Sequence, residues 1–349
     1  MTAPRLPRPR TSLFLAALGV ALSLLFGYLA VRDVQWGAVW EALRTSNYWW
    51  LVPSLAVLAL TVFLKAVRWQ FLFARTTRPP LIPVTTSLLI GHFFNNVLPA
   101  RAGEAARVVA LRLQTKTSAA EAAGTVVSER ILDVLALLAL LFMASPFLPA
   151  VSWIAAAVAL AGVTLACSVV LVVVLGLFGS RPFRAVARLI ARLPGVPREP
   201  LERAADNLAR GFAVFRQPRI AAIAVPLTLA SWLSLALSFW LVMIGFGLDV
   251  GFGAGLLVVI ATNLVLILPS APAAVGVFEA ATLVALKTYG VDDSSALSYA
   301  IVVHAANVLP FVVLGYVALH WHMRSLRLAR RTATPATGAP GALPTPPNV

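Results

Sequence analysis

Two short segments place polar and charged residues where long apolar stretches are interrupted. The first, NNVLPARAGEAARV, covers residues 95–108 and holds two asparagines, a proline, a glycine, a carboxylate and two arginines. The second, NLVLILPSAPAAVGVFEA, covers residues 263–280 and also runs from asparagine through Leu-Pro to glycine and glutamate. Because proline cannot donate to the helix ladder and glycine permits unusual backbone angles, we expect a break in each segment. A helix that restarts there would direct its N-terminal amides and positive dipole end at an anionic group, such as a lipid phosphate.

The two segments share an order of residue types. The corresponding residues are Asn96, Leu98, Pro99, Gly103 and Glu104 in the first segment and Asn263, Leu268, Pro269, Gly276 and Glu279 in the second. Their spacings differ, so the sequence alone supports only a weak internal repeat. For either segment alone, a proline kink that serves only helix packing is a sufficient explanation. The occurrence of two segments with the same order of residue types favours a functional role.

A third segment, SERILD, carries Glu129, Arg130 and Asp133 at the start of an apolar stretch. Ionisable residues inside a membrane are costly and are candidates for function. Glu129 and Asp133 are four residues apart on one helix face, where like charges repel. Their burial therefore requires a cation, which Arg101 and Arg107 can supply. An ion-pair clasp between the first segment and the neighbouring helix is the structural alternative.

The remaining chemistry-bearing residues are few. Glu279 is isolated among apolar residues, and Lys287 follows it two helical turns later. His92 and His304 lie in apolar stretches, where a buried histidine with satisfied hydrogen bonds is favoured over a proton relay. Cys167 is the only cysteine, which excludes a disulfide within the chain. No metal-ligand spacing, nucleotide-binding motif or nucleophile motif occurs, so we predict no metal, no cofactor and no catalytic residue.

The composition is that of an integral membrane protein. The 349 residues are 60% hydrophobic and only 12% charged, and the mean hydropathy is +0.88. A soluble protein of this size needs far more charge to cover its surface. The net charge of +15 would suggest nucleic acid in a soluble chain. Here the arginines gather in particular loops, as the positive-inside rule describes, so no nucleic-acid partner is expected.

Six apolar stretches are long enough to cross a bilayer. They cover residues 12–31, 48–65, 122–147, 153–178, 220–246 and 299–321. Two further apolar regions, 81–118 and 252–287, contain the interrupted segments. We therefore predict an all-α fold, a polytopic membrane helical bundle with about six full spans and two broken hairpins. Each hairpin either re-enters the membrane or crosses it twice.

The loop charges predict one orientation in the membrane. Arginines cluster in four segments: before the first span, after the second, within residues 179–219 and after the last. Arg68 belongs to the cluster after the second span. These segments and both termini are therefore expected in the cytoplasm. Region 81–118 then begins and ends inside, and region 252–287 begins and ends outside, so the hairpins have inverted topology. Many transporters build a midplane binding site from such inverted, interrupted helices.

A single transmembrane domain is expected over residues 12–323, after a basic cytoplasmic head at residues 1–11. Residues 179–219 form a basic, amphipathic cytoplasmic segment, whose arginines either grip anionic headgroups or simply remain in the cytosol. Residues 324–349 form a basic tail rich in proline, alanine and threonine, a composition typical of disorder.

The blocks GHFFNNVLPARAGEAARV, SERILD and LPSAPAAVGVFEA resemble those of one membrane-protein family. It is the flippase-like family of the lysylphosphatidylglycerol synthase transmembrane region, which also includes proteins linked to archaeal glycosylation. The resemblance runs from the first span to Met323 and implies a polytopic bundle that handles lipids. In the synthase branch it implies movement of aminoacylated phospholipid between leaflets. Because the sequence ends at Val349 without the synthase catalytic domain, translocation is expected here, and lipid modification would fall to a separate enzyme.

The motifs and the resemblance together select thirteen residues for lipid binding and translocation. They are Asn96, Pro99, Arg101, Gly103, Glu104, Arg107, Glu129, Arg130, Asp133, Asn263, Pro269, Gly276 and Glu279. The leading hypothesis is a flippase or transporter for an anionic or modified lipid, aminoacylated or glycosylated, in the cytoplasmic membrane of a bacterium. The alternatives are a membrane glycosyltransferase or accessory protein that uses a lipid-linked sugar donor, and a non-transporting scaffold.

Overall fold

The computed structural model describes residues 9–32, 34–73, 76–98, 102–178, 185, 188–191, 199, 218–265 and 270–333. Its longer helices are α1 (Pro9–Val31), α2 (Trp36–Thr45), α3 (Leu51–Phe71), α4 (Leu81–Val97), α5 (Gly103–Gln114), α6 (Ala119–Ala144), α7 (Ser152–Phe178), α10 (Pro218–Gly245), α11 (Phe252–Val265), α12 (Val277–Lys287) and α13 (Asp293–Ala333). Three single-turn helices are η1 (Tyr48–Trp50), η3 (Ser145–Phe147) and η5 (Pro272–Ala274). These ranges contain no strand, so the all-α prediction is confirmed.

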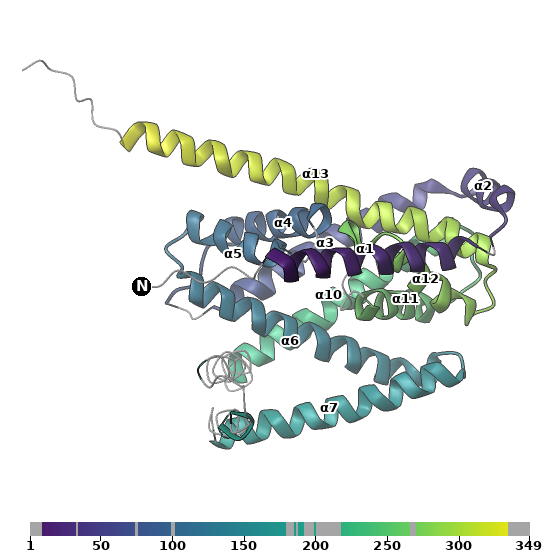
Figure 1. Cartoon of the computed structure of the whole chain (residues 1–349), viewed down its shortest axis with the longest axis horizontal. Coiled ribbons are helices and arrows are strands. Elements are labelled where there is room, and N and C mark those ends of the chain that lie inside the picture. Colours follow the sequence, from purple (N-terminus) through teal and green to yellow (C-terminus); the bar gives the residue numbers. More distant parts are fainter. Residues whose placement is uncertain are drawn as a thin grey trace, which may run out of the picture.

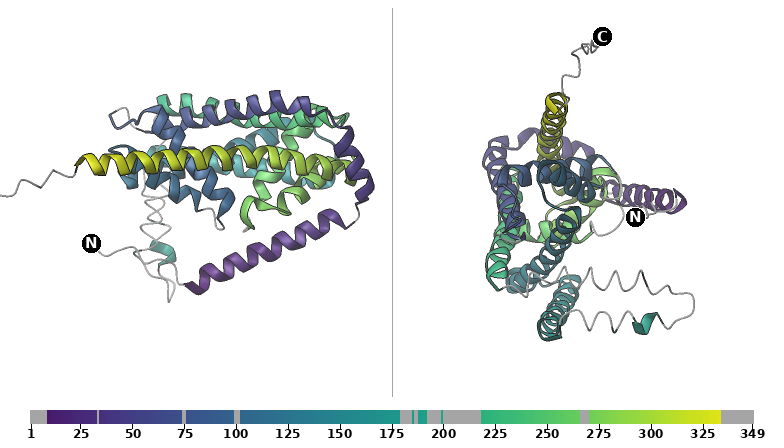
Figure 2. Two further views of the ribbon diagram at one scale, coloured as in Figure 1. Left: turned by 90° about the horizontal axis from the view of Figure 1, so that it is seen from above. Right: turned by 90° about the vertical axis from the view of Figure 1, so that its left-hand side faces the viewer.

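The long helices run close to the long axis of the molecule (Figure 1). Helix α10 packs along α3, and α13 packs along α4, so segments far apart in sequence form the centre of the bundle. Helix α7 lies against α6 at one edge. Helix α1 leans outward from the bundle and packs on α12 (Figure 2). A helix satisfies its own backbone groups, which is why apolar stretches in a membrane fold this way.

Three helices within the described ranges are long and apolar enough to cross a bilayer. They are Tyr48–Phe71, Arg219–Gly245 and Asp293–Arg324, which correspond to three of the six predicted spans. Helices α1 and α2 would make a fourth span if taken together, although they meet at an 84° bend. The predicted spans 122–147 and 153–178 coincide with helices α6 and α7. The total number of crossings stays a prediction.

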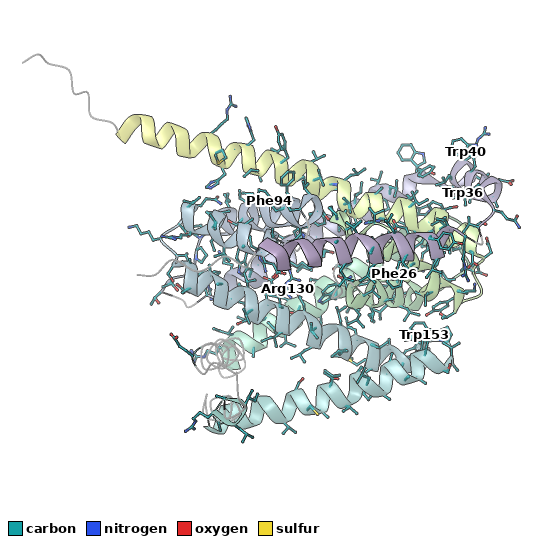
Figure 3. All side chains as sticks on the ribbon, in the orientation of Figure 1. Phe26, Trp36, Trp40, Phe94, Arg130 and Trp153 are labelled. Carbon is teal, nitrogen blue, oxygen red and sulfur yellow. The ribbon has the colours of Figure 1, made fainter. Side chains whose placement is uncertain are left out.

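Three exposed tryptophans lie at one end of the bundle. Trp36 and Trp40 on α2 project there, and Trp153 near the start of α7 lies at the same end (Figure 3). Tryptophan is enriched at the membrane–water interface because its ring is apolar and its N–H is polar. These residues therefore mark one interface of a membrane-embedded bundle.

Helix α3 extends further than its apolar stretch predicts. The predicted span stopped at residue 65, and Arg68 was assigned to a cytoplasmic loop, whereas the helix continues to Phe71. The assignment of Arg68 was wrong, because its side chain lies inside the bundle with no exposed surface. The apolar-run criterion ended the span at its first charge, but a helix continues wherever a buried charge finds partners.

The two interrupted regions each form a pair of short helices. Helix α5 starts at Gly103, and α12 starts at Val277 with Gly276 as its N-cap, as the predicted breaks require. Within each pair the helices pack on one another. The α4–α5 pair lies toward one end of the bundle and the α11–α12 pair toward the other (Figure 1). Helix α4 also contacts η5, so the inner ends of the two pairs meet.

The α4–α5 hairpin closes over two glycines. A Cβ atom on Gly103 would lie 1.9 Å from the carbonyl oxygen of Gly91 and 2.6 Å from Oδ1 of Asn95. That Asn95 oxygen accepts a hydrogen bond from the Gly103 N–H at 2.9 Å and so satisfies the first amide of α5. Gly103 is thus required by close backbone contact and leaves no room for a side chain.

Replacing Gly103 with alanine should therefore destabilise the protein. Forcing the two helices apart is expected to cost about 1–3 kcal/mol, the usual range for overpacking a tight contact. Gly124→Ala is the matched control, because a Cβ on Gly124 meets nothing within 4 Å. In mid-helix it should be neutral or stabilise by about 0.5–1 kcal/mol. The midpoint of thermal unfolding in detergent measures both effects, and an equal response of the two variants would contradict the close-contact account.

Candidate functional site

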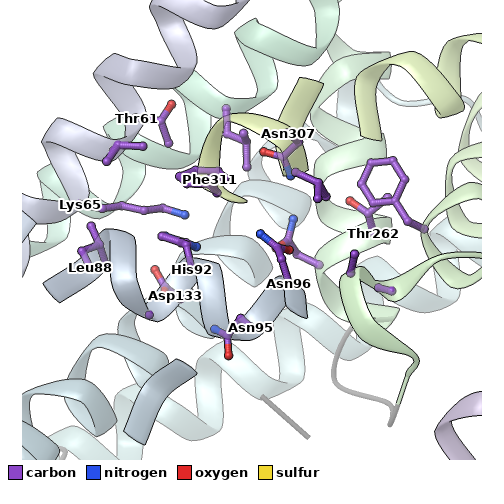
Figure 4. Close-up of a pocket in the computed structure, with 18 of the residues that line it drawn as sticks. Thr61, Lys65, Leu88, His92, Asn95, Asn96, Asp133, Thr262, Asn307 and Phe311 are labelled. Carbon is purple, nitrogen blue, oxygen red and sulfur yellow. The ribbon is translucent and has the colours of Figure 1, made fainter. Parts of the chain in front are cut away.

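A cavity of about 510 Å³ lies where the two hairpins meet, enclosed by α3, α4, α6, α10 and α13. It contains polar and charged side chains although it sits inside an apolar bundle (Figure 4). Two separate apolar clusters flank it: one includes Trp69 and Leu88, and the other includes Phe239 and Phe278. Its volume falls in the usual range of ligand pockets, roughly 300–1,000 Å³.

A buried ion-pair network forms the wall of the cavity at α6. Arg68 on α3 contacts Asp133 at 2.5 Å through Nη1 and Glu129 at 3.1 Å through Nη2. Arg68 also donates to the hydroxyl of Thr228 at 3.1 Å. The Trp232 indole N–H donates to Asp133 at 3.2 Å. Both carboxylates therefore reach cations from other helices, which offsets their mutual repulsion along α6.

The first hairpin adds one cation, Arg107, and one carboxylate, Glu104, to this network. Arg107 Nη1 lies 3.1 Å from both oxygens of Glu129, and its guanidinium lies over the Trp69 ring at 4.8 Å. Arg130 Nε lies 2.8 Å from Glu104, and this more exposed pair stands at the edge of the cavity. The predicted role of Arg107 as a counter-ion for SERILD matches this geometry. Arg68 supplies a second cation. Arg101, the other predicted counter-ion, lies outside the described residues.

Among the described charged residues of the cavity, Lys65 lacks a carboxylate partner. Its side chain points into the cavity from α3 (Figure 4), and its ammonium group lies 4.6 Å from the centre of the Trp232 ring. No carboxylate of the described chain stands within ion-pair distance of it. A cation–π contact holds an ammonium in place without neutralising its charge. Within the described residues, four cations stand at this part of the cavity against three carboxylates, whereas Glu279 pairs separately with His304. The cations are Lys65, Arg68, Arg107 and Arg130, and the carboxylates are Glu104, Glu129 and Asp133.

Uncharged amides complete the lining between the hairpins. Asn96 on α4 and Asn307 on α13 face the cavity (Figure 4), and among the residues of the described ranges neither has a hydrogen-bond partner. Asn263 on α11 also lines the cavity, and its amide nitrogen donates to the Val259 carbonyl at 2.9 Å. Unpaired amides at a cavity wall offer hydrogen bonds to a polar ligand.

The second hairpin carries a carboxylate–histidine pair at its inner end. Glu279 Oε1 lies 2.6 Å from Nδ1 of His304 on α13, and Glu279 Oε2 accepts from the Gly276 N–H at 2.6 Å. Lys287, the cation that follows Glu279 in sequence, instead pairs with Asp293 at 3.2 Å. The amide of Gly276, the N-cap of α12, is therefore occupied by Glu279, as the first amide of α5 is by Asn95, so neither is open to an external anion.

The thirteen residues selected from the sequence fall into three groups. The cavity is lined by Asn96, Glu104, Arg107, Glu129, Arg130, Asp133 and Asn263. Three others support it from behind: Gly103 and Gly276 at the helix starts, and Glu279 through His304. Pro99, Arg101 and Pro269 lie outside the described residues. The roles of all thirteen residues in binding lipid stay predictions.

Sequence reasoning missed Lys65, Arg68 and Trp232. A usable signal existed for two of them, because Lys65 and Arg68 stand at i,i+3 in α3 and share one helix face. Intramembrane charge is a default sign of function. Lys65 already ended the predicted span, and extending that span by six residues to Phe71 would have added Arg68. Trp232 lies in an uncharged stretch, and nothing in the sequence marks its contacts with Asp133 and Lys65.

Comparisons with known proteins agree on one family. The family described as lysylphosphatidylglycerol synthase TM region matches residues 16–315, which include every cavity-lining residue within the described ranges. A UPF0104 membrane protein of Methanothermobacter thermautotrophicus is 26% identical over 281 residues, or 77% of this chain and 82% of the relative. A UPF0104 membrane protein of Methanocaldococcus jannaschii is 24% identical over 228 residues, or 65% of this chain and 93% of the relative. The resemblance seen in the sequence blocks is confirmed.

Proposed function

Because the chain belongs to the family of the lysylphosphatidylglycerol synthase transmembrane region, whose members are multi-pass membrane proteins, we propose that it moves a polar lipid between leaflets. The lipid is anionic, or is an anionic lipid modified with an amino acid or a sugar. Its phosphate enters the cavity between the two hairpins and binds Lys65. This role is transport, without a catalytic step carried out by the chain.

The observation that carries the proposal is the surplus cation in the cavity. Three arginines form ion pairs with three carboxylates, whereas Lys65 contacts the Trp232 ring and has no carboxylate partner within the described residues. A lone cation in an apolar bundle is costly unless an anion joins it. A lipid phosphate supplies that anion, and Asn96 and Asn307 supply hydrogen bonds to the rest of the headgroup.

The edge of the cavity suits a lipid more than a free ion. Leu98 and Val134 line the cavity, and both side chains are exposed. A headgroup can therefore lie among the polar side chains while its acyl chains stay outside against apolar side chains. A soluble anion has no acyl chains and therefore would not be stabilised by such an apolar opening.

The two hairpins support a mechanism of alternating access. Their inner ends meet at the cavity and they lie toward opposite ends of the bundle (Figure 1). If the hairpins have inverted topology, each one separates the cavity from a different side of the membrane. Small movements of one hairpin against the other would then expose the headgroup to one leaflet at a time.

Lipid movement in reconstituted vesicles tests the proposal. The purified chain would be incorporated into vesicles that contain a trace of fluorescent phosphatidylglycerol, lysyl-phosphatidylglycerol or phosphatidylcholine. A membrane-impermeant reductant then reports how much label reaches the outer leaflet. We expect movement of an anionic or modified lipid and little movement of zwitterionic phosphatidylcholine.

The same vesicles separate transport from the enzymatic alternative. A polyprenyl-phosphate sugar donor with a lipid acceptor would be added, and product formation followed by mass spectrometry. Sugar transfer without lipid movement would favour a glycosyltransferase and contradict the proposal. Equal movement of all three fluorescent lipids would contradict the binding of an anionic headgroup, because Lys65 would then make no selection.

A further inference from the structure

The imidazole of His304 stands between two groups that accept hydrogen bonds. Its Nε2 lies 2.8 Å from the carbonyl oxygen of Ala273, and its Nδ1 lies 2.6 Å from the Glu279 carboxylate. A carbonyl can only accept, so Nε2 carries a hydrogen. If Nδ1 carried none and Glu279 were ionised, two lone pairs would face each other at 2.6 Å. This geometry therefore requires one further proton, shared between Nδ1 and Oε1.

We propose that the Glu279–His304 pair is a proton-binding site, and that loss of this proton moves the inner end of the α11–α12 hairpin. With the proton the pair is neutral overall and both of its contacts hold. Without it the pair carries one negative charge within a largely apolar setting, and the short Nδ1–Oε1 contact turns repulsive. The proton leaves to water in the cavity, which His304 and Ala273 both line.

The hairpin end that this pair holds is strained. Ala273 and Ala274 have φ values of 53° and 60°, and Gly276 has a φ of 84°. Alanine in this left-handed region costs roughly 1 kcal/mol or more and persists only where its surroundings impose it. His304 binds the carbonyl of Ala273, and Glu279 binds the amide of Gly276. When Glu279 and His304 share the proton, their hydrogen bond links the two contacts that hold this strained backbone in place.

Few other ionisable groups face the pair. Helices α1, α10 and α11 present no charged side chain to it within their described parts, and Glu41 and Arg44 on α2 are exposed. Lys287 and Asp293 pair with each other at the other end of α12. Across the cavity stand Lys65 on α3, His92 on α4, Glu104 and Arg107 on α5, and Glu129, Arg130 and Asp133 on α6. A headgroup phosphate bound among these groups would add negative charge to the cavity and favour the loaded form of the pair.

Proton binding and lipid binding thus support one another, and this part of the inference rests on the proposed function. If one proton accompanies each lipid, a difference of one pH unit across the membrane can hold about a tenfold ratio of lipid between the leaflets, because one pH unit is a tenfold ratio of proton activity. Lipid movement would then be driven by a proton gradient, without a nucleotide.

Distances between spin labels test the proton site without lipid movement. Cys167, the only cysteine, would be replaced by alanine, and labels attached at Val275 in the hairpin end and Val313 on α13, both exposed. We expect the distance distribution to change between pH 5 and 9 with a single transition. In Glu279→Gln the amide donates to Nδ1 and its oxygen accepts from the Gly276 N–H. This variant mimics the loaded pair and should keep the low-pH distance throughout.

His304→Gln gives a second variant, which removes the imidazole and should keep the high-pH distance throughout. Asp293→Asn, at the start of α13 and away from the cavity, should titrate like the wild type. A distance that does not change with pH in the wild type, or a transition that persists in both Glu279→Gln and His304→Gln, would overturn the proton site.

A pH gradient across reconstituted vesicles tests the coupling. A trace of fluorescent phosphatidylglycerol should reach about a tenfold ratio between leaflets per pH unit in the wild type and an even distribution in Glu279→Gln. An even distribution in the wild type despite lipid movement would overturn the coupling. A pH-dependent spin-label distance with no movement of any lipid would leave the proton site standing and contradict the proposed function instead.

Discussion

Replacing Lys65 with glutamine should slow the movement of anionic lipid by at least about tenfold. A hydrogen bond to a charged group contributes roughly 1.5–3 kcal/mol, and 1.4 kcal/mol is a factor of ten in an equilibrium constant. Lys65 is the cavity cation that rests on an indole ring and keeps its charge available. Glutamine keeps most of the side-chain volume and its ability to donate, so the loss would report charge. The measurement is the initial rate of movement of fluorescent phosphatidylglycerol in reconstituted vesicles.

Two further variants show whether that loss belongs to the cavity. Lys65→Arg keeps the charge over the Trp232 ring and should retain most of the rate. Lys287→Gln removes the same charge from an exposed pair with Asp293, outside the cavity. It should move lipid at the wild-type rate. Equal rates in Lys65→Gln and the wild type would show that this ammonium does not bind the headgroup.

Replacing Arg68 with leucine should cause the largest loss of stability. Arg68 is fully buried and contacts both Glu129 and Asp133, so its removal leaves Asp133 without its closest cation. Breaking a buried ion pair by removing one partner costs about 3–5 kcal/mol. We expect little folded protein from Arg68→Leu, measured as the monodisperse fraction after extraction in detergent and as the midpoint of thermal unfolding.

A double variant identifies the cause of that loss. Arg68→Leu/Asp133→Leu removes both charges and leaves Glu129 paired with Arg107, so it should recover part of the lost stability. Exposed Arg112 on α5 offers the control, and Arg112→Leu should change stability by less than about 0.5 kcal/mol. If the double variant were no more stable than Arg68→Leu, the ion pair would not be the reason for the loss.

Local sequence rules predicted much of this fold. Gly103 and Gly276, each following a proline, marked the starts of α5 and α12, because proline and glycine act on the backbone within a few residues. The length and apolarity of α10 and α13 marked them as spans. The end of α3 was misplaced because it depends on Arg68, whose carboxylate partners lie on another helix.

The candidate site was predicted in part for the same reason. Glu129 and Asp133 required a cation by their spacing alone, and Arg107 supplied it from a neighbouring segment of the sequence. Arg68 and Asp133 are separated by 65 positions, and no local pattern links them. The pairing of Glu279 with His304 depends on how α13 packs against the second hairpin. Lys287 is nearer to Glu279 in sequence, but it pairs with Asp293 instead.

Photocrosslinking at Asn307 tests most directly whether the cavity binds an anionic headgroup. A benzophenone amino acid would replace Asn307, which faces the cavity, in vesicles that contain phosphatidylglycerol and phosphatidylcholine. The same amino acid at Leu309, an exposed position on the outside of α13, reports contact with bulk lipid. Lipid adducts at each position would be identified by mass spectrometry.

We expect position 307 to crosslink to phosphatidylglycerol in preference to phosphatidylcholine, and Lys65→Gln to remove the preference. Position 309 should crosslink to both lipids in proportion to their abundance, with or without Lys65. A lack of lipid adducts at position 307, or the same lipid proportions at both positions, would contradict an anionic headgroup in this cavity.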